Sequence, residues 1–148
     1  MTALSVLRIA GSGLTAQRLR MDVTASNIAN AEATRTADGG PYRRESVVFT
    51  PRQATGGFRL LSTNAFGRAA TTQGVQVAAI VQDPTPPREV LDPLHPDADA
   101  EGYVAYPNVD LVTEMTDMLS ASRAYEANVT MINVAKNMAQ RALDIGRL

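Results

Sequence analysis

The sequence predicts a mainly α-helical chain with a small β-rich insert, because an apolar ladder lies at each end and a polar, proline-containing stretch lies between. Near the N-terminus Leu7, Leu14, Met21 and Ile28 recur every seven residues. The C-terminal ladder alternates steps of four and three residues, which is a heptad seam. Its positions are Leu111, Met115, Met118, Ser122, Tyr125, Val129, Ile132, Lys136, Ala139 and Leu143. We therefore expect the two terminal helices to pair as a coiled-coil-like layer.

The N-terminal ladder predicts a helix over residues 3–30, which contain no proline. Its length would be about 27 residues, or roughly 40 Å. Gly11 and Gly13 weaken it by about 1 kcal/mol each relative to alanine, and Arg18 is an imperfect seam residue. Such a helix is marginal alone, so its stability must come from packing against another segment. Residues 31–41 end in Asp38-Gly-Gly-Pro41, which predicts a loop.

The middle of the chain predicts short strands. Glu45–Thr50 is a strand that Pro51 ends, and Phe58–Leu61 is a further short strand. Gly74–Asp83 gives the clearest strand pattern. One face of this strand is expected to hold Val75, Val77, Ala79 and Val81. Residues 84–107 hold six of the eight prolines and predict an extended connector, with an edge strand at residues 102–106.

The C-terminal ladder predicts one long helix, because Val109–Ile145 contains neither glycine nor proline. Asn108 is the expected N-cap, with Asp110 in the first turn. A helix of about 37 residues would span roughly 55 Å, against about 11–12 residues for an average helix. Its apolar stripe then needs partners. Both an antiparallel hairpin within one domain and packing among several subunits remain open. We expect residues 1–37 and 108–148 to form a terminal-helix core and residues 38–107 a small outer domain.

Composition limits the function classes. The formal net charge is −1 with interspersed signs, so no nucleic-acid partner is expected. The absence of cysteine removes disulfides and thiolate zinc sites. The sequence contains no run of about 18 apolar residues, so membrane insertion is not expected. Arg8 interrupts the first apolar run, which is unlike a cleavable signal peptide.

Three segments suggest chemistry, and each has a simpler explanation. Gly11-Ser-Gly-Leu-Thr-Ala16 has the form of a dinucleotide-binding loop, with Glu32 beyond it, but helical spacing continues through the glycines. His95, Asp97 and Asp99 could hold a metal, although the flanking prolines favour a solvated loop. Arg43-Arg44 could meet phosphate, or could form ordinary ion pairs. No nucleophile set can be built around a single histidine without a thiol. We therefore predict no catalytic residue, no cofactor and no metal.

Both ends of the chain resemble one family. The stretch Ser12-Gly-Leu-Thr-Ala-Gln-Arg-Leu-Arg-Met-Asp-Val-Thr-Ala-Ser-Asn-Ile-Ala-Asn-Ala31 resembles the N-terminal signature of the bacterial flagellar axial proteins of the rod and hook. Pro107-Asn-Val-Asp-Leu-Val-Thr-Glu-Met115 and Ser120-Ala-Ser-Arg-Ala-Tyr-Glu-Ala-Asn128 resemble their C-terminal motif. The short chain, and Gly39-Gly-Pro-Tyr42 where distal members usually carry a Thr-Pro-Gly-Tyr turn, favour the proximal rod.

The resemblance implies a structural subunit whose paired terminal helices pack into a tube around a channel, with the middle segment outside. It also implies a periplasmic rod of the flagellar basal body that transmits torque, self-association, neighbouring rod subunits as partners, and export through the flagellar type III apparatus without a cleavable signal. The ladders then predict the assembly interface. Its residues are Leu4, Leu7, Leu14, Met21, Ile28, Leu111, Met115, Met118, Tyr125, Val129, Ile132 and Leu143.

Overall fold

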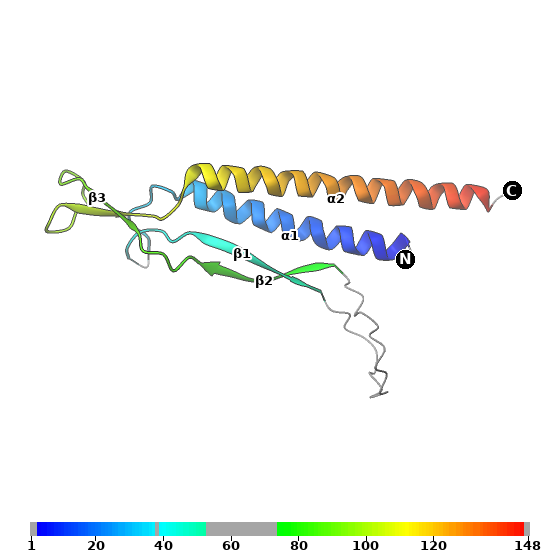
Figure 1. Ribbon diagram of the computed structural model, residues 1–148, viewed down its shortest axis with the longest axis horizontal. Coiled ribbons are helices and arrows are strands. Elements are labelled where there is room, and N and C mark those ends of the chain that lie inside the picture. Colours follow the sequence, from blue (N-terminus) through cyan, green and yellow to red (C-terminus); the bar gives the residue numbers. More distant parts are fainter. Residues whose placement is uncertain (1–2, 38, 53–73, 147–148) are drawn as a thin grey trace, which may run out of the picture.

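A computed structural model describes residues 3–37, 39–52 and 74–146 and shows an elongated molecule (Figure 1). Two long helices lie side by side in opposite directions, and one β-hairpin runs along the first of them. A second hairpin lies at the end remote from the chain termini. The elements are α1 (Ala3–Ala29), β1 (Glu45–Pro51), β2 (Val75–Gln82), β3 (Arg88–Leu91), β4 (Tyr103–Tyr106) and α2 (Leu111–Ile145). The predicted fold class, mainly helical with a small β insert, is confirmed.

Helix α1 has 27 residues, as the proline-free ladder predicts. It ends where Asn30 folds back on the last turn, donating from both its backbone N–H and its side-chain Nδ2 to the carbonyl of Ser26. Such a side chain competes with the backbone for hydrogen bonds and favours helix ends. The predicted loop that follows leads the chain away from the helix axis and into β1.

Helix α2 has 35 residues and begins two residues later than the sequence predicts. The N-cap is Asp110, whose carboxylate accepts a hydrogen bond from the backbone N–H of Val112. The predicted cap, Asn108, instead accepts from the backbone N–H of Arg44 at 3.5 Å. Both residue types cap well, so composition alone could not choose between them. Asn108 is used to join the start of α2 to the start of β1.

Strands β1 and β2 form an antiparallel two-stranded sheet with one β-bulge. Val48 lies opposite Ala79 and Phe49 lies opposite Val77, so Ala78 is an extra residue on β2. An extra residue in one strand reverses the alternation of its side chains between the two faces.

Because of the bulge, the side chains that share a face of β2 differ from those that the sequence predicts. Opposed residues of an antiparallel pair lie on the same face, so Val77 and Ile80 share the face of Phe49 and Val47 that is turned toward α1. The predicted single face of Val75, Val77, Ala79 and Val81 is therefore wrong beyond Ala78. The predicted strand Phe58–Leu61 lies outside the described residues.

Strands β3 and β4 form a second antiparallel pair, in which Leu91 lies opposite Tyr103. The edge strand predicted at residues 102–106 is confirmed as β4. Strand β3 was not predicted, because the surrounding prolines mark the segment only as extended. A two-stranded sheet consists of edge strands, where nearby prolines are tolerated.

The core is small and made mostly of alanine. The buried apolar residues in the described part of the chain are Ala10, Ala16, Val23, Val104, Ala121 and Ala135. Helix α1 packs on α2 and on the β1–β2 hairpin, so the helix pair and part of the predicted outer domain are in contact. The proposed division into a helical core and an outer domain stays a prediction.

Candidate assembly surface

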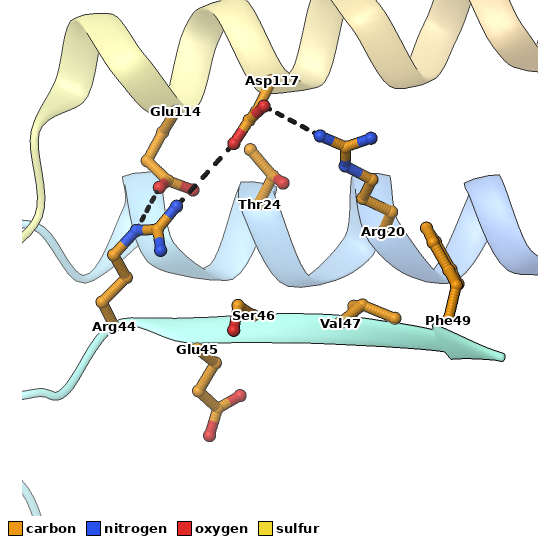
Figure 2. Close-up of a pocket in the computed structure, with 9 residues that line it drawn as sticks. All are labelled: Arg20, Thr24, Arg44, Glu45, Ser46, Val47, Phe49, Glu114 and Asp117. Carbon is orange, nitrogen blue, oxygen red and sulfur yellow. Dashed lines mark hydrogen bonds and ion pairs between the residues drawn. The ribbon is translucent and has the colours of Figure 1, made fainter. Parts of the chain in front are cut away.

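A polar cluster joins the two helices to the start of β1 (Figure 2). Glu114, in the first turns of α2, is 1% exposed, and so is Asn27 near the end of α1. Asn27 Nδ2 donates to Glu114 Oε2 at 2.9 Å, and Arg44 Nε donates to Glu114 Oε1 at 2.6 Å. The Glu114 carboxylate thus connects α1, α2 and the residue before β1.

Asn27 uses all of its side-chain hydrogen-bonding capacity. Its Nδ2 also donates to the carbonyl of Glu45 at 2.8 Å. Its Oδ1 accepts from the Tyr42 hydroxyl and from the backbone N–H of Glu45, each at 2.9 Å. A buried amide is costly unless it is satisfied in this way. Asn27 therefore ties α1 to the chain segment that enters the hairpin.

The arginines of the cluster are paired with carboxylates. Arg20 donates to Asp117 at 2.8 Å, while Arg44 also lies 3.7 Å from Asp117 and 3.9 Å from Asp83. Hydrogen bonds from Thr85 hold the pKa of Asp83 below its ordinary value, and the Arg44 charge lowers it further. The ion-pair explanation of Arg44 is confirmed, whereas Arg43 is exposed. The cluster borders a cavity of about 300 Å³ lined by Arg20, Thr24, Arg44, Glu45, Ser46, Val47, Phe49, Glu114 and Asp117 (Figure 2).

A close approach of the helices lies two heptads from the Asn27–Glu114 contact. Gly13 faces Asn128, and a Cβ on Gly13 would lie 2.9 Å from Asn128 Nδ2. The two contacts fix one register, with Glu114, Ala121, Asn128 and Ala135 toward α1. A slip of one heptad would remove Asn27 from Glu114 and leave a buried carboxylate without that partner, which is costly. Buried polar residues set the register of coiled coils in this way.

The predicted interface residues fall into two groups: some are half-buried beside this contact, and the others are exposed. Glu114, Ala121 and Ala135 are the buried residues of α2, and none of the twelve predicted residues is buried. The half-buried ones are Leu7, Leu14, Met21, Ile28, Met118, Tyr125 and Ile132. The exposed ones are Leu4, Leu111, Met115, Val129 and Leu143. Whether they contact other subunits stays a prediction.

Sequence reasoning missed other residues on these surfaces. Further large apolar side chains on the helices are exposed: Ile9, Val112, Leu119, Met131, Val134, Met138 and Ile145. It also missed the buried roles of Asn27, Glu114 and Arg44. The heptad spacing of Glu114, Ala121, Asn128 and Ala135 could have indicated a second, small and polar seam.

The remaining candidate segments have structural roles. Gly11 and Gly13 lie inside α1, with no strand leading into them, so the arrangement of a dinucleotide-binding loop is absent there. His95 Nδ1 accepts from the backbone N–H of Asp97. Asp97 accepts from Thr34 at 2.8 Å, and Asp99 accepts from the backbone of Tyr103 at 2.7 Å. Across the described ranges no three His, Cys, Asp or Glu side chains are grouped to hold a metal. Neither described helix is long and apolar enough to span a membrane.

Comparison with known proteins identifies the class of the chain. A family model described as flagella basal body rod protein matches residues 7–35. A second model, described as the C-terminal part of the flagellar basal body rod FlgEFG proteins, matches residues 100–145. The matched residues include most of α1 and all of α2. The helix pair is thus of the flagellar basal-body rod class, and the resemblance seen in the sequence is confirmed.

Curated relatives define the family more narrowly. The chain is 49% identical to the flagellar basal-body rod protein FlgC of Borreliella burgdorferi, over 95% of both chains. It is 44% identical to FlgC of Escherichia coli O6:H1 and 43% identical to FlgC of Bacillus subtilis, over 99% of this chain and all of each relative. The chain belongs to the FlgC family of flagellar basal-body rod proteins.

Proposed function

We propose that the chain is a structural subunit of the flagellar basal-body rod, and that it polymerises through the outer faces of α1 and α2. The observation that carries the proposal is the distribution of apolar side chains. The α1–α2 contact buries small and polar residues, while Leu, Ile, Val and Met side chains remain exposed on the outside. A protein that folds only for itself would bury the large apolar side chains first.

Exposed apolar residues surround α2. At 100° per residue, Val112, Leu119 and Val134 lie on the side opposite the buried Ala121. Leu111, Val129 and Leu143 lie on one flank, and Met131 and Met138 lie on the other. A helix that is apolar on all sides is normally buried on all sides. Helix α1 covers one side, which leaves three for neighbouring subunits.

The family resemblance supports the finer parts of the proposal. In our proposal the helix pairs form the wall of a periplasmic tube, with the β1–β2 hairpin on the outside. The rod transmits torque from motor to hook, and its subunits reach it unfolded through the flagellar type III apparatus. Rigidity arises because many shallow contacts, each worth about 25 cal/mol per Å² of apolar area, add up along the tube. The role involves no catalytic step, cofactor, nucleic acid or membrane insertion.

Imaging of intact basal bodies tests the proposal. Density for this chain should lie in the rod, with α1 and α2 in the wall and the hairpins at larger radius, and deletion cells should not swim. A chain located outside the rod, or deletion cells that swim normally, would contradict it.

The free subunit offers a further prediction. Because the outer faces of α1 and α2 have no partner before assembly, we expect the purified monomer to have weak helical circular dichroism and no sharp thermal transition. Helical signal should rise when the chain is incorporated. A strongly helical monomer with cooperative melting would count against assembly-coupled ordering.

A further inference from the structure

Two exposed methionines lie one heptad apart on one flank of α2. Met131 is 52% exposed and Met138 is 67% exposed. At 100° and 1.5 Å per residue, their side chains leave the helix within about 20° of each other and about 10 Å apart along its axis. We call Met131 and Met138 the thioether pair. It lies on the flank of α2 opposite to that of Leu111, Val129 and Leu143.

The two flanks of α2 differ in their reactivity toward oxidants. An exposed thioether is readily oxidised to a sulfoxide, which is polar. The opposite flank consists of the hydrocarbon side chains of Leu111, Val129 and Leu143, which carry no such sulfur atom. Met115, which is 53% exposed, lies nearer the hydrocarbon flank, so its oxidation would leave three large apolar side chains there. The flank of the thioether pair is therefore the one whose apolar character depends on methionine.

Oxidation by hydrogen peroxide transfers one oxygen atom to the thioether. A sulfur lone pair attacks one peroxide oxygen, the O–O bond breaks, and a sulfur–oxygen bond forms, while the second oxygen leaves as water. The sulfur is oxidised by two electrons and the peroxide is reduced by two. The new oxygen accepts hydrogen bonds, and its burial in an apolar contact without a donor is unfavourable.

We propose that the thioether pair is an oxidation-sensitive site of the free subunit, at which hydrogen peroxide forms methionine sulfoxide, and that the modified subunit is excluded from the rod. The inference rests on the proposed function, because only a flank that meets a neighbouring subunit can be blocked in this way. Before assembly no neighbouring subunit covers the pair. Reduction of the sulfoxides by methionine sulfoxide reductases restores the apolar flank and with it the ability to assemble.

Paired substitutions test whether polarity on this flank stops assembly. Met131→Gln together with Met138→Gln introduces polar, uncharged side chains of similar length. The matched control joins Met131→Leu with Met138→Leu, which keeps the flank apolar, and all three residue types favour helix similarly. At equal cellular levels in deletion cells, the glutamine pair should be about tenfold less abundant in isolated basal bodies than wild type, which corresponds to about 1.4 kcal/mol. The leucine pair should be close to wild type.

The results separate the oxidation site from the rod role. A glutamine pair at the wild-type level in basal bodies would overturn the site and leave the rod role of the wild-type chain intact. A leucine pair as scarce as the glutamine pair would show that polarity is not what stops incorporation, and would also overturn the site. Absence of the wild-type chain itself from basal bodies would contradict the proposed function instead.

Hydrogen peroxide tests the modification itself. Wild-type chain and the leucine pair are expressed together in deletion cells that lack methionine sulfoxide reductases, and rods form with or without added peroxide. Damage to other proteins affects both chains equally, so the measured quantity is the ratio of wild-type to variant peptides in basal bodies, determined by mass spectrometry. Peroxide should lower this ratio several-fold relative to the ratio among unassembled chains, because only the wild-type chain becomes polar on this flank.

The unassembled chains provide a second measurement in the same cells. Sulfoxide at Met131 and Met138 should be frequent in the unassembled wild-type chain and rare in basal bodies. A ratio that peroxide leaves unchanged, with sulfoxide present at both residues in the unassembled chain, would overturn the exclusion of modified subunits. Unoxidised methionine at both residues in the unassembled chain would overturn the assignment of the thioether pair as an oxidation-sensitive site.

Discussion

The α1–α2 contact and the outer surface of the same two helices have opposite compositions. The contact holds Gly13 against Asn128, alanines, and the satisfied Asn27–Glu114 pair. The outer surface holds the exposed leucines, valines and methionines. Small residues allow close helix approach, and a buried polar pair accepts only one register. The contact is thus suited to fixing the register of the two helices, while most of the exposed apolar area lies on the outer surface.

This difference separates two tasks that a self-contained domain performs with one core. Within the subunit, directional hydrogen bonds decide how α1, α2 and β1 are placed. Between subunits, we propose that apolar burial supplies the free energy of assembly. A rod subunit of this design would be weakly stable alone and correctly shaped when it assembles.

The largest effect is expected on the outer surface. Val129→Asp places a charge where we expect a neighbouring subunit, and an unpaired buried charge costs several kcal/mol. Expression and solubility should be unchanged, while swimming in soft agar should fall to that of a deletion strain. The matched control is Val48→Asp, since Val48 and Val129 are similarly exposed, at 43% and 37%. Fully motile Val129→Asp cells would show that the interface assignment is wrong.

The second effect concerns the polar contact. Arg44→Met removes a partner of buried Glu114, and breaking a buried pair costs about 3 kcal/mol or more. Arg20→Met removes the half-exposed pair with Asp117 and should cost about 0.2–1 kcal/mol. Trimethylamine oxide favours the compact state, so the purified chain is titrated with this osmolyte. The measured quantity is the osmolyte concentration at which half of the helical signal appears. Equal shifts for both variants would contradict the special role of Glu114.

The third effect compares two glycines of α1. Gly11→Ala meets no atom within 4 Å of its new Cβ and should stabilise the helix by about 1 kcal/mol. Gly13→Ala would press on Asn128, whose Nδ2 donates to Ala124 at 2.9 Å. Overpacking costs about 1–3 kcal/mol, so the net effect should be zero or destabilising. The same osmolyte midpoint measures both variants. Identical shifts would show that the two helices accommodate the extra methyl group at residue 13 without a cost in stability.

The sequence predicts the parts of the fold that depend on periodicity. Both terminal helices, β1, β2 and β4 follow from apolar spacing and from the positions of proline and glycine. Strand β3 could not be predicted, because Arg88–Leu91 becomes a strand only through pairing with β4. The bulge at Ala78 was equally hidden, since an alanine among alternating valines does not indicate an extra residue.

The contact between the helices could not be predicted from the sequence. Large apolar residues at heptad spacing predict an assembly surface, which stays a prediction, but they do not indicate which face of α2 meets α1 within the subunit. That choice is made by Asn27, Glu114 and Arg44, which are far apart in the sequence and meet only after folding. Polar residues on a helix are usually solvated, so nothing local distinguishes Glu114 from an exposed glutamate.

The smallest effect concerns the start of α2 and its dependence on pH. Hydrogen bonds from the Thr113 hydroxyl and the Val112 backbone hold the pKa of Asp110 below its ordinary value. A carboxyl with a lowered pKa in the folded state contributes stability above its unfolded-state pKa, and this stability is lost as the pH falls through the folded-state pKa. Helical signal near the osmolyte midpoint should therefore decrease on acidification below about pH 4.

Asp110→Asn isolates this contribution, because asparagine caps a helix about as well but carries no charge. The variant should match wild type closely at neutral pH and lose less helical signal on acidification. Acid acts on other parts of both proteins alike, so the measured quantity is the difference between variant and wild type. If acid lowers the helical signal of both equally, the cap charge has no part in the stability of α2, and Asp110 acts only through the hydrogen bond to Val112.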